Sequence, residues 1–212
     1  KIVSVFSHLA GADEPEHDDF TLYQAGCFEK MSMNISENLE IHPFRHILNS
    51  AGILRFPQYQ FDMVRLGIGL YGFDSSMLYQ NHLQQVSTLK TTISQIHEIK
   101  PEDSVGYSRK GKLPEGGKVA TIAIGYADGY PRILGNGKAY VKINGKKARV
   151  IGNICMDMTM VDVSLVDCSE GDTVIVFGSD PDIFQLAQLA QSIPYEILTN
   201  IKDRVKRIYF SR

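Results

Sequence analysis

Three short groups of residues, each at the end of or within an apolar, β-branched run, are the part of this sequence best suited to chemistry. His8 follows the first run, Asn49 and Ser50 close the second, and Gly67 and Ile68 lie in the third. Hydroxyls and backbone N–H groups at strand ends commonly bind phosphate, and a glycine lets the backbone approach an anion closely. The same residue types are common in ordinary turns, so the spacing alone leaves both interpretations open.

The runs that must position these residues alternate with helical segments over residues 1–72. Strands are expected at 2–6, 44–49 and 63–70, with an amphipathic helix whose apolar stripe is Phe20, Tyr23, Cys27 and Met31, and then a loop or short helix through Pro57. Strands that alternate with helices predict a parallel sheet, and the polar residues at its strand ends would form the site. Three such units are too few to close an eight-stranded barrel. We therefore predict that residues 1–80 are the last third of a (β/α)8 barrel.

From about residue 83 the pattern changes to short alternating strands, which predicts an antiparallel β domain over residues 81–212. Strands are expected at 86–98, 118–124, 140–143, 146–151, 158–163, 172–177 and 207–210. Asn144-Gly145 suits a type I′ hairpin turn. A helix is predicted to start with Asp180 as N-cap and Pro181 at its first position. Its buried face would hold Ile183, Leu186, Ala187 and Ala190.

Composition narrows the class of protein. The 212 residues are 43% hydrophobic and 22% charged, with a formal net charge of −2, as in a soluble globular protein that does not bind nucleic acid. No run approaches the roughly 20 apolar residues of a membrane span, and the first residues do not resemble a signal peptide, so no membrane role is expected. The three cysteines form no Cys-x-x-Cys pair, which favours a reducing cytosol. His42 and His46 are four apart, but Pro43 argues against a zinc site, and no metal is predicted.

Six stretches resemble, in order, the fold-type III, pyridoxal-phosphate-dependent alanine racemases. They are SHLAGAD (7–13), HILNSA (46–51), VRLGIGLYG (64–72), VGY (105–107), IGYADGYPR (124–132) and GNICMD (152–157). The resemblance covers nearly the whole chain. It implies a barrel that holds the cofactor and a C-terminal β domain that lends a catalytic tyrosine to the partner's site.

The resemblance assigns pyridoxal 5′-phosphate as the cofactor and places a set of residues around it: His8, His46, Asn49, Ser50, Arg65, Gly67 and Ile68. Arg65 would face the pyridine nitrogen. Because a guanidinium stays protonated, it can only donate to that nitrogen, which makes the ring a weaker electron sink. This suits removal and return of one α-proton, whereas a carboxylate there would suggest decarboxylation or transamination.

Tyr107 resembles the catalytic base that serves one face of the substrate. A phenol with a pKa near 10 is a poor base at neutral pH, so nearby cations or hydrogen bonds must lower that pKa, and His8 and Arg65 are the expected helpers. By resemblance His8 lies between the tyrosine and the arginine, and His46 hydrogen-bonds on the arginine side.

By resemblance, the substrate would meet Met156, whose amide would receive its carboxylate, and Asp157, with Tyr126, Asp128 and Arg132 along an access corridor. A tight turn between strands would explain the corridor residues equally well. Three features depart from the family pattern: Asp203 stands where some members have a phosphate-binding tyrosine, Asn153 where some have an arginine, and Ser108 follows the tyrosine where glycine is usual.

These features predict the C-terminal portion of an alanine racemase, a cytoplasmic homodimer with a shared site that interconverts L- and D-alanine for peptidoglycan synthesis. The family's Schiff-base lysine motif does not occur in this sequence. Two alternatives stay open: another fold-type III racemase or decarboxylase, and a non-catalytic folding or dimerisation module. Fusion to an upstream domain, such as a cell-wall ligase, is also compatible with the sequence.

Overall fold

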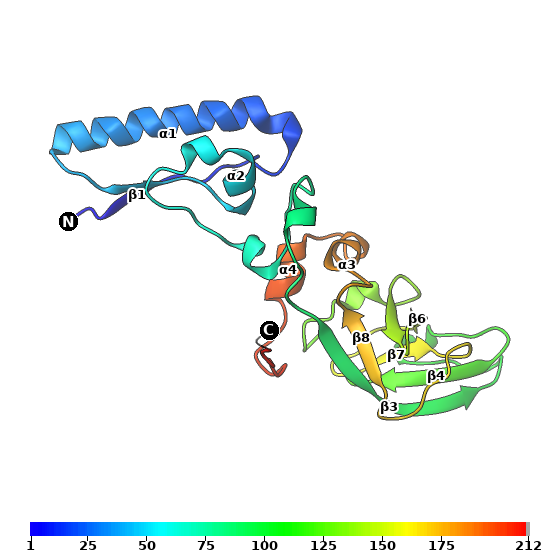
Figure 1. The fold of residues 1–212 in the computed structure, drawn as a ribbon. Helices are drawn as coiled ribbons and strands as arrows, with labels where there is room; N and C mark the ends of the chain where they lie inside the picture. Colours follow the sequence, from blue (N-terminus) through cyan, green and yellow to red (C-terminus); the bar gives the residue numbers. More distant parts are fainter. Residues whose placement is uncertain (211–212) are drawn as a thin grey trace. The chain divides into compact units, whose positions relative to one another are not determined.

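The computed structural model describes residues 1–210, which form two compact units, Lys1–Val86 and a second that begins at Ser87. The first unit contains, in order, β1 (Ser4–Phe6), α1 (Asp18–Leu39), β2 (Phe44–His46) and α2 (Ser50–Arg55), as Figure 1 shows. Short 3-10 helices lie at Pro15–His17, Pro57–Tyr59, Ile68–Tyr71 and Gln80–His82. β1 and β2 pair in parallel and in register, and α1 is the crossover that a parallel pair requires.

The strand predicted at 63–70 is not formed, and its second half is the 3-10 helix Ile68–Tyr71. The segment does lie beside β2. The Asp62 amide donates to the Arg45 carbonyl at 3.1 Å, and the Arg65 amide donates at 2.9 Å to the carbonyl two residues beyond β2. The Arg45 amide, however, donates to the Asp62 carboxylate at 2.8 Å. A side chain thus occupies a position of the ladder, and no regular strand pairing forms.

The helix predicted after the first strand is confirmed as α1, but the predicted apolar stripe is not its buried face. Phe20, Tyr23 and Met31 are 53%, 69% and 64% exposed. The buried residues of α1 are Thr21, Ala25, Phe28 and Ser32. Three of these side chains are small, so the helix lies close to its neighbours, and Phe28 fills a cluster with Leu9, Ile47 and Phe56.

The second unit is built around a closed, six-stranded antiparallel barrel in the order β3-β4-β7-β6-β5-β8. Its strands are β3 (Leu89–Ile99), β4 (Gly117–Ile122), β5 (Tyr140–Ile143), β6 (Lys146–Ile151), β7 (Thr159–Asp162) and β8 (Thr173–Phe177). Six of the seven strands predicted for this domain are therefore confirmed. Asn144 and Gly145 both have positive φ, 49° and 77°, as a type I′ turn requires.

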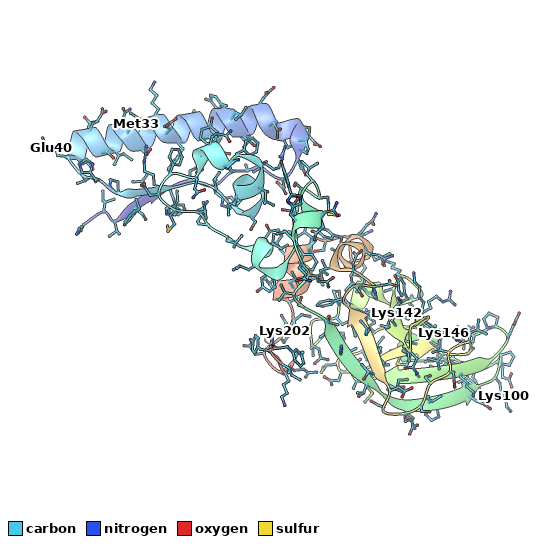
Figure 2. The ribbon with its side chains drawn as sticks, in the orientation of Figure 1. Met33, Glu40, Lys100, Lys142, Lys146 and Lys202 are labelled. Atoms are coloured by element: carbon cyan, nitrogen blue, oxygen red, sulfur yellow. The ribbon has the colours of Figure 1, made fainter. Side chains whose placement is uncertain are left out.

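The predicted start of the next helix is wrong by two residues. α3 spans Ile183–Leu189, and Asp182 caps it by accepting from the Gln185 amide at 2.8 Å. Asp180 instead turns to the barrel, where its carboxylate binds Lys142 Nζ at 2.6 Å and the Tyr140 hydroxyl at 2.5 Å. Figure 2 labels Lys142 on the barrel. The predicted buried face is confirmed, since Ile183, Leu186, Ala187 and Ala190 are buried.

A second helix, α4 (Pro194–Thr199), precedes the tail. The strand predicted at 207–210 is not formed. The Arg207 guanidinium instead donates to the carbonyls of Ile201, Lys202 and Val205 at 2.5–2.7 Å, so the tail folds back on its own backbone. Among residues 1–210, no helix has the length and apolar character needed to cross a membrane.

Candidate active site

Arg65 lies at the ends of β1 and β2 and connects the two strands. Its Nη2 donates to the Ser7 carbonyl at 2.7 Å and to the Ile47 carbonyl at 3.0 Å, and lies 3.2 Å from His8 Nδ1. Ser7 and Ile47 directly follow the two strands. Because the carboxyl ends of parallel strands meet at one edge of a sheet, one guanidinium can bind both carbonyls. The structure thus brings the predicted residues His8 and Arg65 together.

The Nε of Arg65 is buried and has no hydrogen-bond partner among the described residues. Buried N–H groups are nearly always paired, so an unpaired one needs an explanation. The guanidinium also lies over the Phe6 ring, 5.2 Å from its centroid. Arg65 is therefore held by its far nitrogen and by an aromatic face, while Nε–H remains available to an acceptor such as a pyridine nitrogen.

His46 is buried and stacks on the same phenylalanine, with ring centroids of Phe6 and His46 5.2 Å apart and planes 6° from parallel. No hydrogen bond joins His46 to Arg65 within residues 1–210, contrary to the resemblance, and His46 Nδ1 has no partner there. Burial, and then the charge of Arg65, lower the pKa of His46 below its usual value. His46 is thus placed to remain neutral beside a fixed cation.

Ser50 organises the predicted phosphate site. Its Oγ accepts from the Gly67 amide at 2.9 Å and from the Gly69 amide at 3.2 Å, which leaves the hydroxyl hydrogen to donate elsewhere. The Gly67 amide is used within the chain and is not free for an anion. The Ile68 amide is at the first position of its 3-10 helix, where an N–H has no acceptor within the helix. Ser50 and Ile68 are therefore the groups that suit a phosphate.

Asn49 and Gly67 shape the predicted phosphate site around Ser50. Asn49 Oδ1 caps α2 by accepting from the Gly52 amide at 2.9 Å, and so orients Ser50 at the start of the helix. A Cβ built on Gly67 would meet only Ser50 Oγ, at 3.7 Å. The space beside the Gly67 backbone is thus open, as the close approach of an anion requires.

In the second unit, Tyr107 is 72% exposed on a loop with unusual backbone angles. Gly106 has φ 74° and ψ −177°, Ser108 φ 59° and Arg109 φ 52°. A non-glycine residue in the left-handed region costs about 1–2 kcal/mol. The loop therefore carries Tyr107 on a strained turn, a feature that often accompanies function.

Two further loops of this unit carry the predicted substrate residues and contact each other. The Tyr126 amide donates to the Cys155 carbonyl and the Ala127 amide to the Met156 carbonyl, both at 3.0 Å. A Cβ on Gly125 would lie 2.3 Å from the Cys155 and Met156 carbonyl oxygens, so only glycine permits this crossing. The Met156 amide has no acceptor in the described part of the chain.

Arg204, which the sequence did not single out, ties these loops to the C-terminal tail. Its guanidinium binds Asp128 at 2.7 Å and also forms an ion pair with Asp157. The two carboxylates, Asp128 first, raise the pKa of Arg204. Asp128 in turn accepts from the Gly125 amide at 2.9 Å. Arg132 and Asp203, also predicted at this end, are exposed.

The predicted site residues thus form two local groups, one in each unit. The residues around Arg65 and Ser50 lie in the first unit, and Tyr107, Tyr126, Met156 and Asp157 lie in the second. The action of His8 and Arg65 on Tyr107 remains a prediction.

Two family models match the chain. "Alanine racemase, N-terminal domain" matches residues 1–75, and "Alanine racemase, C-terminal domain" matches residues 86–209. "Alanine racemase 1" of Clostridium acetobutylicum is 38% identical, covering 98% of this chain and 55% of that protein.

Solved structures agree with the sequence comparison. The alanine racemase of Streptomyces coelicolor superposes with a TM-score of 0.91 and 31% identity, covering 100% of this chain and 57% of that one. The alanine racemase of Bartonella henselae, whose structure has covalently bound pyridoxal phosphate, gives 0.88 and 32%, covering 99% and 57%. This chain therefore spans somewhat more than half the length of these relatives.

The structure has two units, a β/α unit with Arg65 and Ser50 at its strand ends and a closed antiparallel barrel. The matches to both family models specify this arrangement further. The chain belongs to the alanine racemase family.

Proposed function

We propose that this chain provides the C-terminal part of a barrel domain and the β domain of an alanine racemase that interconverts L- and D-alanine with pyridoxal 5′-phosphate. When bound, this cofactor supplies an electron sink for the α-carbon of an attached amino acid. Arg65 would donate Nε–H to its ring nitrogen, and the Ser50 hydroxyl and Ile68 amide would bind its phosphate.

The second unit would supply the groups that act on the substrate. Tyr107 Oη would remove the α-proton on one face of the substrate while the family's lysine delivers a proton to the opposite face, and the two groups would exchange these roles for the other enantiomer. The Met156 amide receives the substrate carboxylate, and Asp157, Tyr126 and Arg132 line the approach. Because an arginine keeps the ring nitrogen unprotonated, proton exchange is favoured over decarboxylation.

The active form would be a homodimer in which each site combines the first unit of one subunit with the second unit of its partner. The reaction would supply D-alanine for peptidoglycan in the cytoplasm, where the precursors of the cell wall are made. An upstream fused domain is compatible with this arrangement.

One observation supports the cofactor assignment most directly: Arg65 Nε is buried and unpaired while Nη2 binds two backbone carbonyls. A guanidinium fixed in this way keeps one unpaired N–H donor at Nε, and a pyridine nitrogen is a suitable acceptor for it.

The first test is the intact mass of the polypeptide as its native cell makes it, before and after borohydride reduction with added pyridoxal phosphate. We expect a chain heavier than 23.7 kDa that retains one cofactor and racemises alanine. A polypeptide of 23.7 kDa that retains none would favour the non-catalytic module instead.

A matched pair of variants tests the role of Arg65 in the full-length protein. Arg65→Gln is expected to shift the absorption band of the bound cofactor because the donor to its ring is weakened. Arg45→Gln, in the same unit and paired loosely with Asp62 at 3.9 Å, is expected to leave the band in place. An equal shift in both variants would contradict the assignment.

A further inference from the structure

Asn153 is a buried side chain with both ends of its amide in use. It is 5% exposed. Its Nδ2 donates to the Tyr107 carbonyl at 3.0 Å, and its Oδ1 accepts from Asn136 Nδ2 at 3.1 Å. Only the nitrogen can face a carbonyl, so these partners fix the orientation of the amide.

Asn136, the residue that donates to Asn153, is itself anchored on the barrel. The Asn136 amide donates at 2.7 Å to the carbonyl of Gly152, the residue that follows β6. The hydrogen bonds therefore run from the end of a barrel strand, through Asn136 and Asn153, to the backbone of Tyr107.

The Tyr107 loop depends on backbone contacts for its placement. The loop is closed at its base by Val105 and Gly111, whose amides and carbonyls bond reciprocally at 2.8 and 3.0 Å. Between them lie three residues with positive φ, and Tyr107 itself is 72% exposed. An exposed ring is not held by packing. The buried donor that binds the loop between its two closing residues is Asn153.

We propose that Asn153 is a positioning residue for Tyr107, and that its amide, held by Asn136, keeps the strained loop in the conformation that presents the phenol. The importance of that phenol for chemistry rests on the proposed racemase function. The hydrogen bond from Asn153 to the loop does not rest on that function, and its effect on the loop can be measured without an activity assay.

The first measurement is amide hydrogen exchange over residues 105–111 in the full-length protein. Asn153→Asp keeps the shape and removes the donor, and it places a carboxylate against the Tyr107 carbonyl. Loss of this hydrogen bond is expected to speed exchange at Val105, Arg109 and Gly111 by about tenfold. Asn136→Gly keeps the positive φ and removes the outer donor, so a smaller increase is expected.

Asn144→Gly is the matched control, because Asn144 also has a positive φ, 49°, and its Nδ2 also donates to a backbone carbonyl, that of Asp167, at 3.1 Å in another turn of the barrel. It should leave exchange at residues 105–111 unchanged. Unchanged loop exchange in a folded Asn153→Asp protein would overturn the proposal, as would an equal increase in the control. If Asn153→Asp does not fold, Asn136→Gly decides the question by the same comparison.

A kinetic measurement then relates the loop to chemistry. In Asn153→Asp we expect kcat to fall by about tenfold with KM within about twofold, and the isotope effect of α-deuterated alanine to rise for one enantiomer only. The isotope effect is a ratio of two rates on the same enzyme sample, so it does not depend on the fraction of the protein that is folded. A loss of stability alone therefore cannot change the isotope effect. If the wild-type protein does not racemise alanine, the proposed function fails, while the exchange result still decides the role of Asn153.

Discussion

At the scale of single residues, Ser108 has the clearest conformational cost in the candidate site. Its φ of 59° and ψ of 16° place it in the left-handed region, which glycine adopts freely and other residues do not. We expect Ser108→Gly to raise the free energy of unfolding by about 0.5–1 kcal/mol, measured by urea unfolding followed by circular dichroism.

Ser94→Gly provides the control for this change. Ser94 is exposed in β3 and is not one of the residues with positive φ. Glycine there increases only the freedom of the unfolded chain, so the variant should lose about 0.5–1 kcal/mol. Destabilisation by both variants would show that the angles of Ser108 carry no cost.

His46 predicts a pH dependence of stability. Its pKa in the folded chain is lowered, by burial first and then by Arg65, so the unfolded chain binds the proton more readily than the folded one. The stability contributed by the neutral His46 ring is therefore fully present above the unfolded-state pKa of about 6.5, and it declines as the pH falls below that pKa. Urea midpoints between pH 8 and pH 5 should show this decline in the first unit.

The control for the histidine keeps the aromatic stack. His46→Phe retains a ring against Phe6, whose centroid is 5.2 Å away, but it cannot titrate. The decline below pH 6.5 should become shallower in this variant. An identical pH profile in the two proteins would mean that other groups cause the decline.

At the scale of elements, Arg204 connects the tail to two loops. Arg204→Gln removes both ion pairs, with Asp128 and Asp157. We expect faster hydrogen exchange at the Tyr126 and Ala127 amides and a KM for alanine raised about threefold with kcat nearly unchanged. Because the pairs are partly exposed, high salt should reduce the difference from wild type.

Arg207→Gln is the comparison for this variant, because Arg207 binds carbonyls of the tail itself. It should leave exchange at Tyr126 and Ala127 at the wild-type rate. If the two substitutions act alike, the tail is merely loosened and Arg204 has no specific hold on the loops.

Elements with local signals could be predicted from the sequence, whereas those set by neighbours could not. The β5–β6 hairpin follows from Asn144-Gly145, because two residues with positive φ suit that turn. The strand predicted at 63–70 failed because the Asp62 carboxylate, just before it, accepts the Arg45 amide of β2 in place of one ladder bond. The face of α1 was missed because its large apolar residues are exposed and small ones make the close contact.

The candidate site likewise contains residues that local motifs predict and residues that only the fold brings together. Ser50, Arg65 and Tyr107 were found because short motifs surround them. The contacts of Arg204 with Asp128 and of Asn153 with Tyr107 join residues 76 and 46 positions apart. No local pattern encodes such pairs, since the closed barrel and the folded tail bring them together. For Arg204, only the opposite charge of Asp128 and Asp157 gave a signal.

At the scale of the whole molecule, the division into two units separates the groups that would bind the cofactor from those that would act on the substrate. If each site of a dimer combines the first unit of one subunit with the second unit of the other, one site can work when one subunit has a damaged first unit and its partner has a damaged second unit. A Tyr107→Phe subunit and a subunit without the Schiff-base lysine should then complement each other.

The expected recovery can be stated from the symmetry. After unfolding and refolding an equal mixture, half the dimers are mixed, and each mixed dimer has one site with both tyrosine and lysine, so about one quarter of wild-type activity should return. Each variant refolded alone should stay inactive, and a Tyr209→Phe subunit in place of Tyr107→Phe serves as a positive control for refolding. If the mixture stays inactive while that control regains activity, each site is built within one subunit, and Tyr107 acts on the cofactor of its own chain.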